Sequence, residues 1–215
     1  MAVSKKLFLL LVLAFYCSSL QAQDITGSGV WFGNDLKYLP SKKIDINFSC
    51  EYREVVTPPQ FGALLFEPSL DYNFSKHLTL SAGYRFDIRQ DYLFRHRSFA
   101  DISYDAKLVK KISATFRMRY QKDFQIGEFN DNYLRPKLSV KYKLSKKISP
   151  FVYGEIFYHL WFKGNQFDDI RISGGINYDF TKKYSVKLYY LNDKEFNVSF
   201  PLTQSVIGIS FGEDF

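Results

Sequence analysis

The sequence has no apolar run long enough to form a transmembrane helix. A spanning helix needs about 20 apolar residues, and no stretch after residue 22 approaches that length. Cysteine is equally scarce: Cys50 is the only one after residue 22, so no internal disulfide can form within that part of the chain. We therefore expect a fold without membrane helices and without disulfide cross-links.

Residue types that hold metals or phosphates are also sparse. The sequence has 3 histidines, and they are scattered, whereas zinc sites draw on clustered histidine and cysteine. It contains no glycine-rich phosphate loop. The net charge of +7 is spread over many segments and forms no single basic stripe of the kind that binds nucleic acid. These absences predict no metal, no cofactor and no nucleic-acid partner.

The N-terminal segment, residues 1–22, has the layout of a secretory signal peptide. Lys5 and Lys6 supply positive charge, Leu7 to Tyr16 supply the apolar segment, and Ala22 is a small residue suited to cleavage. The apolar segment is too short to anchor the chain as a spanning helix. We expect export through the Sec pathway, cleavage after Ala22, and one mature domain at residues 23–215.

A strict alternation of apolar and polar residues dominates the rest of the chain. In residues 78–88 the even positions are apolar from Leu78 to Ile88, while the odd positions include Thr79, Arg85 and Asp87. Successive side chains of a β-strand point to opposite faces. The same even-apolar parity holds from residue 43 to residue 190. It predicts one sheet with one continuous apolar face.

Short basic turns recur along this pattern, and they divide it into hairpins. Their last residues, which are Lys43, His77, Lys111, Lys147 and Lys183, are 34, 34, 36 and 36 positions apart. Each spacing is even, so the apolar parity never inverts, as it would after a slip of one residue. The expected strands are residues 27–40, 43–55, 64–74, 77–89, 94–108, 111–123, 133–144, 148–162, 169–180, 184–194 and 202–213.

The count of eleven conflicts with the even strand number that is usual in bacterial barrels. A turn at Gly33–Asp35 could split the first segment and give twelve strands. Alternatively, residues 24–32 could cross the lumen. The last strand also departs from the parity, because Ile207, Ile209 and Phe211 are at odd positions.

Together, the leader and the alternation predict an all-β fold, namely a single antiparallel transmembrane β-barrel of about ten to twelve strands in a Gram-negative outer membrane. Short basic turns would face the periplasm and longer segments would face outside, where the barrel meets lipid and lipopolysaccharide. The expected longer segments are Val56–Ala63, Asp91–Leu93, Phe124–Asn132, Lys163–Asp168 and Glu195–Pro201. The aromatic terminus, Phe215, resembles the signal that barrel-assembly machinery recognises.

Several segments resemble a family of outer-membrane proteins from Bacteroidota, domain of unknown function 2490. They are Val30–Phe32, Ala82–Phe86, Arg95–Arg97, Arg117–Tyr120, Asn132–Leu138, Pro150–Tyr158 and Gly174–Tyr178. Their order covers nearly the whole mature chain. The resemblance implies an outer-membrane barrel and supplies no established activity.

A cluster of arginines is the main candidate site. It comprises odd-numbered residues on four consecutive expected strands, so all would face the lumen: Arg85, Arg89, Arg95, Arg97, Arg117, Arg119 and Arg135. Arginine binds carboxylate or phosphate groups in a two-pronged manner, and rings of arginine favour anions in pores. Carboxylates such as Glu67, Asp101 and Glu155 share the inward parity. A structural network of ion pairs is therefore the favoured interpretation, and a pathway for small anions is the alternative.

A second constellation would lie on the outer face. His96 and Ser98 have even parity and resemble the catalytic pair of barrel-type lipid A deacylases, in which histidine is the general base and serine the nucleophile. No acidic residue at an even position on the adjoining strands is available to orient His96. We therefore expect a non-enzymatic barrel, either structural or a narrow pore, with a lipid-modifying enzyme as the rival interpretation.

Overall fold

The computed structural model describes residues 27–56, 59–90, 93–125, 130–161, 165–199 and 201–215. The expected signal peptide, residues 1–22, lies outside the described residues. Eleven strands are described, close to the expected segments: β1 (Gly27–Tyr38), β2 (Ile44–Val56), β3 (Pro59–Asn73), β4 (Leu78–Arg89), β5 (Phe94–Val109), β6 (Ile112–Gln125), β7 (Asp131–Tyr142), β8 (Ile148–Leu160), β9 (Gln166–Asp179), β10 (Tyr184–Glu195) and β11 (Thr203–Asp214). No helix among these residues is long and apolar enough to cross a membrane.

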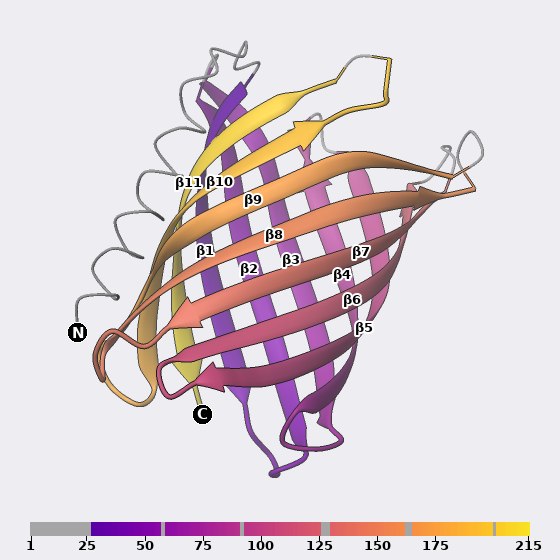
Figure 1. The fold of residues 1–215 in the computed structure, drawn as a ribbon. Coiled ribbons are helices and arrows are strands. Elements are labelled where there is room, and N and C mark those ends of the chain that lie inside the picture. Colours follow the sequence, from indigo (N-terminus) through magenta and orange to yellow (C-terminus); the bar gives the residue numbers. More distant parts are fainter. Residues whose placement is uncertain (1–26, 57–58, 91–92, 126–129, 162–164, 200) are drawn as a thin grey trace.

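The strands close into a barrel in chain order (Figure 1). Every neighbouring pair is antiparallel except β1 and β11, which run parallel and close the barrel, from Gly27 opposite Gln204 to Lys37 opposite Asp214. An odd number of antiparallel strands leaves the first and last strands pointing the same way, so only a parallel pairing can close the ring.

The structure corrects both sequence-based explanations of the odd strand count. β1 is one continuous strand, and Gly33, Asn34 and Asp35 pair with β2 on one side and β11 on the other. These residues therefore do not form a turn that yields a twelfth strand. Residues 27–32 also belong to the wall and do not cross the lumen.

The alternation of side chains places apolar residues on the outer surface and charged residues inside. Large side chains at even positions, such as Ile102 at 56% and Leu188 at 55%, are exposed on the outside. The parity is inverted along β11, where Ile207 is 60% exposed and Val206 is buried. The inversion follows from the β10–β11 register, which sets Tyr190 opposite Ile207.

The short basic turns share one local structure that explains their sequence. In four of them a hydroxyl oxygen accepts hydrogen bonds from the backbone N–H groups two and three residues later. The hydroxyls belong to Ser41, Ser75, Ser145 and Thr181. Serine and threonine stabilise turns in this way, and the lysines that follow are exposed. We call this end of the barrel the turn end and the opposite end the loop end.

The wall extends further toward the loop end than the sequence predicted. The expected segment Val56–Ala63 is wrong as a long loop, because β2 continues to Val56 and β3 begins at Pro59. A bulge between Arg53 and Glu54 shifts the register there, so Phe61 faces outward and Ala63 faces inward. Pro59 is the first residue of β3, a position at which a strand tolerates proline.

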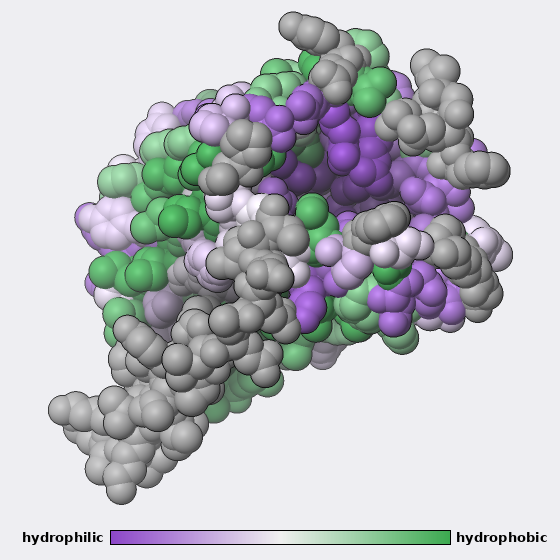
Figure 2. Space-filling view, turned by 90° about the horizontal axis from the view of Figure 1, so that it is seen from above, coloured by the Kyte–Doolittle hydropathy of each residue, from purple (hydrophilic) through white to green (hydrophobic). Residues whose placement is uncertain are grey.

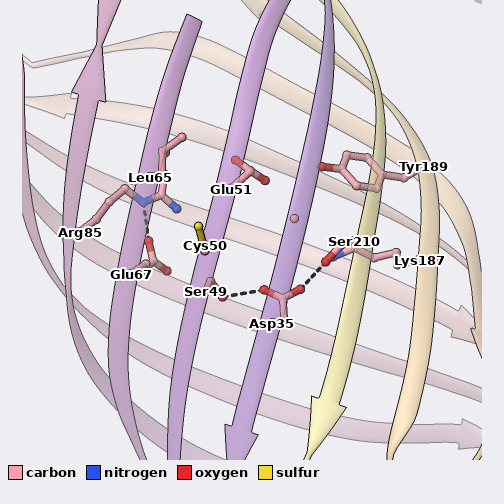
Figure 3. Close-up of a pocket in the computed structure, with 11 residues that line it drawn as sticks. Asp35, Ser49, Cys50, Glu51, Leu65, Glu67, Arg85, Lys187, Tyr189 and Ser210 are labelled. Atoms are coloured by element: carbon pink, nitrogen blue, oxygen red, sulfur yellow. Dashed lines mark hydrogen bonds and ion pairs between the residues drawn. The ribbon is translucent and has the colours of Figure 1, made fainter. Parts of the chain in front are cut away.

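The seam between β1 and β11 is held by packing and by a bridging carboxylate. Trp31, Leu191 and Val206 form a buried apolar cluster. Below it, Asp35 accepts hydrogen bonds from Ser49 (2.6 Å) and Ser210 (2.5 Å), and so links β1 to both neighbours (Figure 3).

Candidate functional site

The lumen holds all seven predicted arginines, and acidic residues pair with them in a network that spans β3 to β8. Arg89, on the rim of the loop end, is the most exposed of them, and its guanidinium lies 3.6 Å from Asp87. Arg85 donates to Glu67 at 2.5 Å. Seen from above, the barrel has a hollow lined by hydrophilic residues (Figure 2).

Two arginines of the lumen make two-pronged contacts with carboxylates. Arg97 makes a two-pronged contact with Asp123, at 2.6 and 2.8 Å, and Arg95 contacts the same carboxylate. Arg119 makes an equivalent contact with Asp101, at 2.7 and 2.8 Å. Such two-pronged pairs fix both charge and orientation.

The guanidinium of Arg119 stacks on the ring of Phe99. It lies 3.7 Å from the centre of the ring, a geometry in which the ring attracts the cation. Phe99 in turn covers Gly83, where an added Cβ would lie 2.3 Å from the ring. The glycine is therefore required for the ring to lie flat beneath the arginine.

In the middle of the lumen, several cations share one carboxylate. Glu155 accepts from Arg117 at 2.5 Å and pairs with Arg135 at 3.0 Å. Arg135 also donates to Gln121 at 2.6 Å. Lys137, on the same strand as Arg135, has its ammonium 3.6 Å from the Tyr153 ring centre.

Two further arginines and two lysines of the lumen were missed by the sequence analysis. Arg53 pairs with Glu51 at 2.7 Å and stacks over Trp31 at 3.7 Å, and Arg171 pairs with Asp193. Both are at odd positions, as are Lys137 and Lys187. The signal that could have found them was the parity itself, applied beyond the four arginine-rich strands.

Two cavities between these side chains concern the candidate site. The larger, which we call the central cavity, has a volume of about 290 Å³ and lies among Arg117, Arg135, Lys137, Tyr153 and Arg171. The smaller, which we call the seam cavity, has a volume of about 140 Å³ and lies beside Asp35, Lys187 and Ser210 (Figure 3). Glu51, Glu67, Arg85, Lys187 and Tyr189 line both cavities, so the two adjoin.

Near the loop end, a histidine lies between two aspartates. His159 contacts Asp168 through Nδ1 at 2.8 Å and Asp131 through Nε2 at 3.2 Å, and it stacks on Tyr133 at 4.3 Å. His159, at an odd position, faces the lumen and is buried. Asp168, at an even position, also reaches inside because a bulge follows Phe157 in the β8–β9 register.

On the outer surface, His96 lies in an aromatic cluster. Its Nδ1 lies 2.6 Å from the Tyr84 hydroxyl, and its ring stacks on Phe124 at 5.4 Å. Ser98 is exposed nearby, and within the described chain no hydrogen bond joins it to His96. A tyrosine hydroxyl therefore occupies the position where a serine hydrolase has a carboxylate.

Comparison with protein families identifies the class of protein to which this architecture belongs. The model of a family described as "Protein of unknown function (DUF2490)" matches residues 28–202, which is 175 of the 215 residues. The chain belongs to this family, as the resemblance of its motifs implied. Comparison with curated proteins finds no significant match.

Proposed function

We propose that the protein is a non-enzymatic barrel of a Gram-negative outer membrane, with a lumen narrow enough to serve as a structural core or as a conduit for small solutes only. The observation that carries this proposal is the closed wall with an apolar outer surface and a charged interior. Outer-membrane barrels alternate apolar and polar residues in this way.

The exposed apolar surface supports a lipid environment. Large apolar side chains are exposed on all eleven strands, including Phe48, Ile102, Leu138, Ile176 and Ile207. Soluble monomers rarely expose contiguous apolar patches of more than a few hundred Å². A bilayer would cover this band, and the closed sheet leaves no unpaired strand edge in the hydrocarbon.

The orientation follows from the unequal ends of the barrel. In bacterial barrels short turns face the periplasm and longer loops face outside. The lysine-rich turns would then be periplasmic, and the surface around Asn130 and Asn197 would be external. In this orientation β1 begins at the external end and β11 ends at the periplasmic end.

The charged network supports a constricted lumen. Arginines from β2, β4, β5, β6, β7 and β9 reach into it and pair with carboxylates of other strands or of their own. Small barrels commonly fill their interiors with side chains in this way. The remaining cavities admit small solutes and exclude large ones. We do not propose lipid-modifying catalysis, because Tyr84 and not a carboxylate contacts His96.

Cell fractionation combined with cysteine labelling tests the location and the orientation. Single cysteines at Lys146 and at Asn197, in a Cys50→Ser background, are exposed to an impermeant thiol reagent on intact cells. We expect recovery in the outer-membrane fraction and labelling at position 197 only. Labelling at position 146 but not at 197 would invert the orientation, and recovery in the soluble fraction would refute the proposal.

Planar-bilayer recording tests the constricted lumen. Purified protein should give small conductance steps or none, because side chains occupy the lumen. Large, stable conductance steps of the kind given by water-filled porins would contradict a constricted lumen while leaving the membrane location intact.

A further inference from the structure

The central cavity has an excess of positive charge that the rest of the lumen lacks. Eight cationic side chains line it, against three carboxylates. Two of the eight, Arg119 and Arg171, pair with Asp101 and Asp193, which lie outside the lining. Counting these two carboxylates, eight positive charges face five negative charges. An excess of three remains.

The excess belongs to four of the eight cations. Arg53, Arg85, Arg119 and Arg171 each have a carboxylate partner. Arg117 and Arg135 share Glu155. Neither Lys137 nor Lys187 has a carboxylate within ion-pair distance in the described part of the chain. Their ammonium groups lie over aromatic rings, Lys137 over Tyr153 and Lys187 over Tyr189.

Unpaired hydrogen-bond donors provide an independent observation. Among the described residues, the Nε atoms of Arg117, Arg135 and Arg171 are buried and have no hydrogen-bond partner, and all three residues line the central cavity. The side chain of Arg135 is only 5% exposed. A buried donor without a partner costs free energy, and native proteins rarely leave such donors unpaired.

The cations are also held in fixed positions before any ligand arrives. Arg135 and Arg171 lie 4.0 and 5.2 Å from the centre of the Phe157 ring, and Lys137 lies over Tyr153. Groups that are already ordered lose less entropy on binding.

We propose that the central cavity binds a compact oxyanion with two or more negative charges, such as a phosphate monoester or a tricarboxylate. Its volume of about 290 Å³ lies at the lower end of ligand pockets, which run from roughly 300 to 1,000 Å³. That size favours a compact anion over a nucleotide or an oligosaccharide. The inference rests on the proposed function only in that the anion reaches the site through the lumen.

Titration calorimetry on the full mature chain, folded in detergent micelles, tests the site with pyrophosphate and with citrate. At constant ionic strength we expect saturable binding of one or both, with one anion per barrel, and no saturable binding of chloride. Preference between the two probes distinguishes a phosphate ligand from a carboxylate ligand. No saturable binding of either probe at millimolar concentration would overturn the inference.

Two double lysine variants distinguish binding at the central cavity from a general electrostatic attraction of anions to the protein. Lys137→Met with Lys187→Met removes two cavity charges that have no carboxylate partner. Lys110→Met with Lys146→Met removes two turn charges and is the matched control. A hydrogen bond to a charged group contributes enough that each cavity lysine should change affinity by about tenfold or more. An equal loss in the control would contradict a specific site. The single variants, measured in parallel, give the same test if the double variant fails to fold.

The Glu155→Gln variant should change anion affinity in the opposite direction from the lysine variants. It removes the carboxylate that Arg117 and Arg135 share, so anion affinity should rise, whereas damage to the fold would lower it. A lower affinity in a folded Glu155→Gln protein would contradict the charge argument.

Vesicle flotation of the same samples separates this inference from the proposed function. Protein that floats with vesicles and binds no anion would overturn only the anion site. Protein that binds anion in micelles but does not associate with vesicles would overturn only the membrane role.

Discussion

The two-pronged arginine pairs and the group around Glu155 combine the same residue types in different ways. Asp123 and Asp101 hold Arg97 and Arg119 in two-pronged pairs. Glu155 accepts one hydrogen bond from Arg117 and pairs with Arg135, and Lys137 beside them has no carboxylate within ion-pair distance among the described residues. The first arrangement fixes strands to one another. The second, on our proposal, leaves charge available for an anion, so the arginines of one lumen can have more than one role.

The largest effect should come from removing the carboxylate of a two-pronged pair. Asp123→Ala would leave Arg95 and Arg97 without their partner. Losing one member of a buried pair costs about 3–5 kcal/mol, and less where water enters. Urea unfolding in lipid vesicles measures the loss. Asp105→Ala is the control, because this carboxylate is exposed and, among the described residues, accepts one side-chain hydrogen bond, from Thr115. Equal losses would mean that the two-pronged pairs contribute little.

Leu138→Arg and Ser139→Arg test the register on which the comparison depends. Leu138 is 53% exposed on the outer surface, and Ser139 is the next residue, on the inner face. An arginine on the lipid-facing side costs about 2–4 kcal/mol near the bilayer midplane. The inner substitution should cost less, because the lumen is already polar. Refolding and unfolding in vesicles compare the two, and a larger loss from Ser139→Arg would reverse the assignment of the faces.

Gly208→Ala tests the packing at the seam beside the central cavity. An added Cβ would lie 2.1 Å from the Tyr189 ring, so the ring must move, and overpacking of this kind costs about 1–3 kcal/mol. Gly154→Ala is the matched control, because a Cβ there has nothing within 4 Å. We expect a lower midpoint of urea unfolding for Gly208→Ala only. Equal midpoints would show that Tyr189 adapts freely.

The smallest effect on stability should come from Lys137→Met without added anion. Lys137 has no carboxylate partner within ion-pair distance among the described residues, and its loss relieves repulsion from neighbouring cations. The free energy of unfolding should stay within about 1 kcal/mol of the wild type or rise, although a weak cation–π contact of about 0.5–1 kcal/mol is lost. A loss comparable to that of Asp123→Ala would place Lys137 in the structural network instead.

Local alternation was enough to predict the eleven strands and the inward arginines. Alternation reports which way each side chain points, so Arg97 and Arg119 could be assigned to the lumen from their odd positions. The same rule could have assigned Arg53 and Arg171, and the inward aromatics Trp31 and Phe157.

Closure and charge partners could not be read from the sequence. The β1–β11 pairing depends on how the whole sheet curves, and the alternation of β1 is the same whether or not it has a second neighbour. Whether Arg117 and Arg135 both reach Glu155 depends on the register between the strands, which the sequence of one strand does not determine. The loop near Pro59 was mispredicted because a proline at the start of a strand resembles a proline in a turn.

The parallel seam has a consequence for folding. Gly27 pairs with Gln204, 177 positions later, whereas the other strand pairs join neighbours along the chain. Until β11 is available, β1 has an unpaired edge, and such an edge is a template for pairing with another chain. Contacts between distant parts of a chain are slow to form because loop-closure entropy must be overcome first. Closure of the seam should therefore be the last step of folding, and a chain truncated before Thr203 should be held open and associate with other chains.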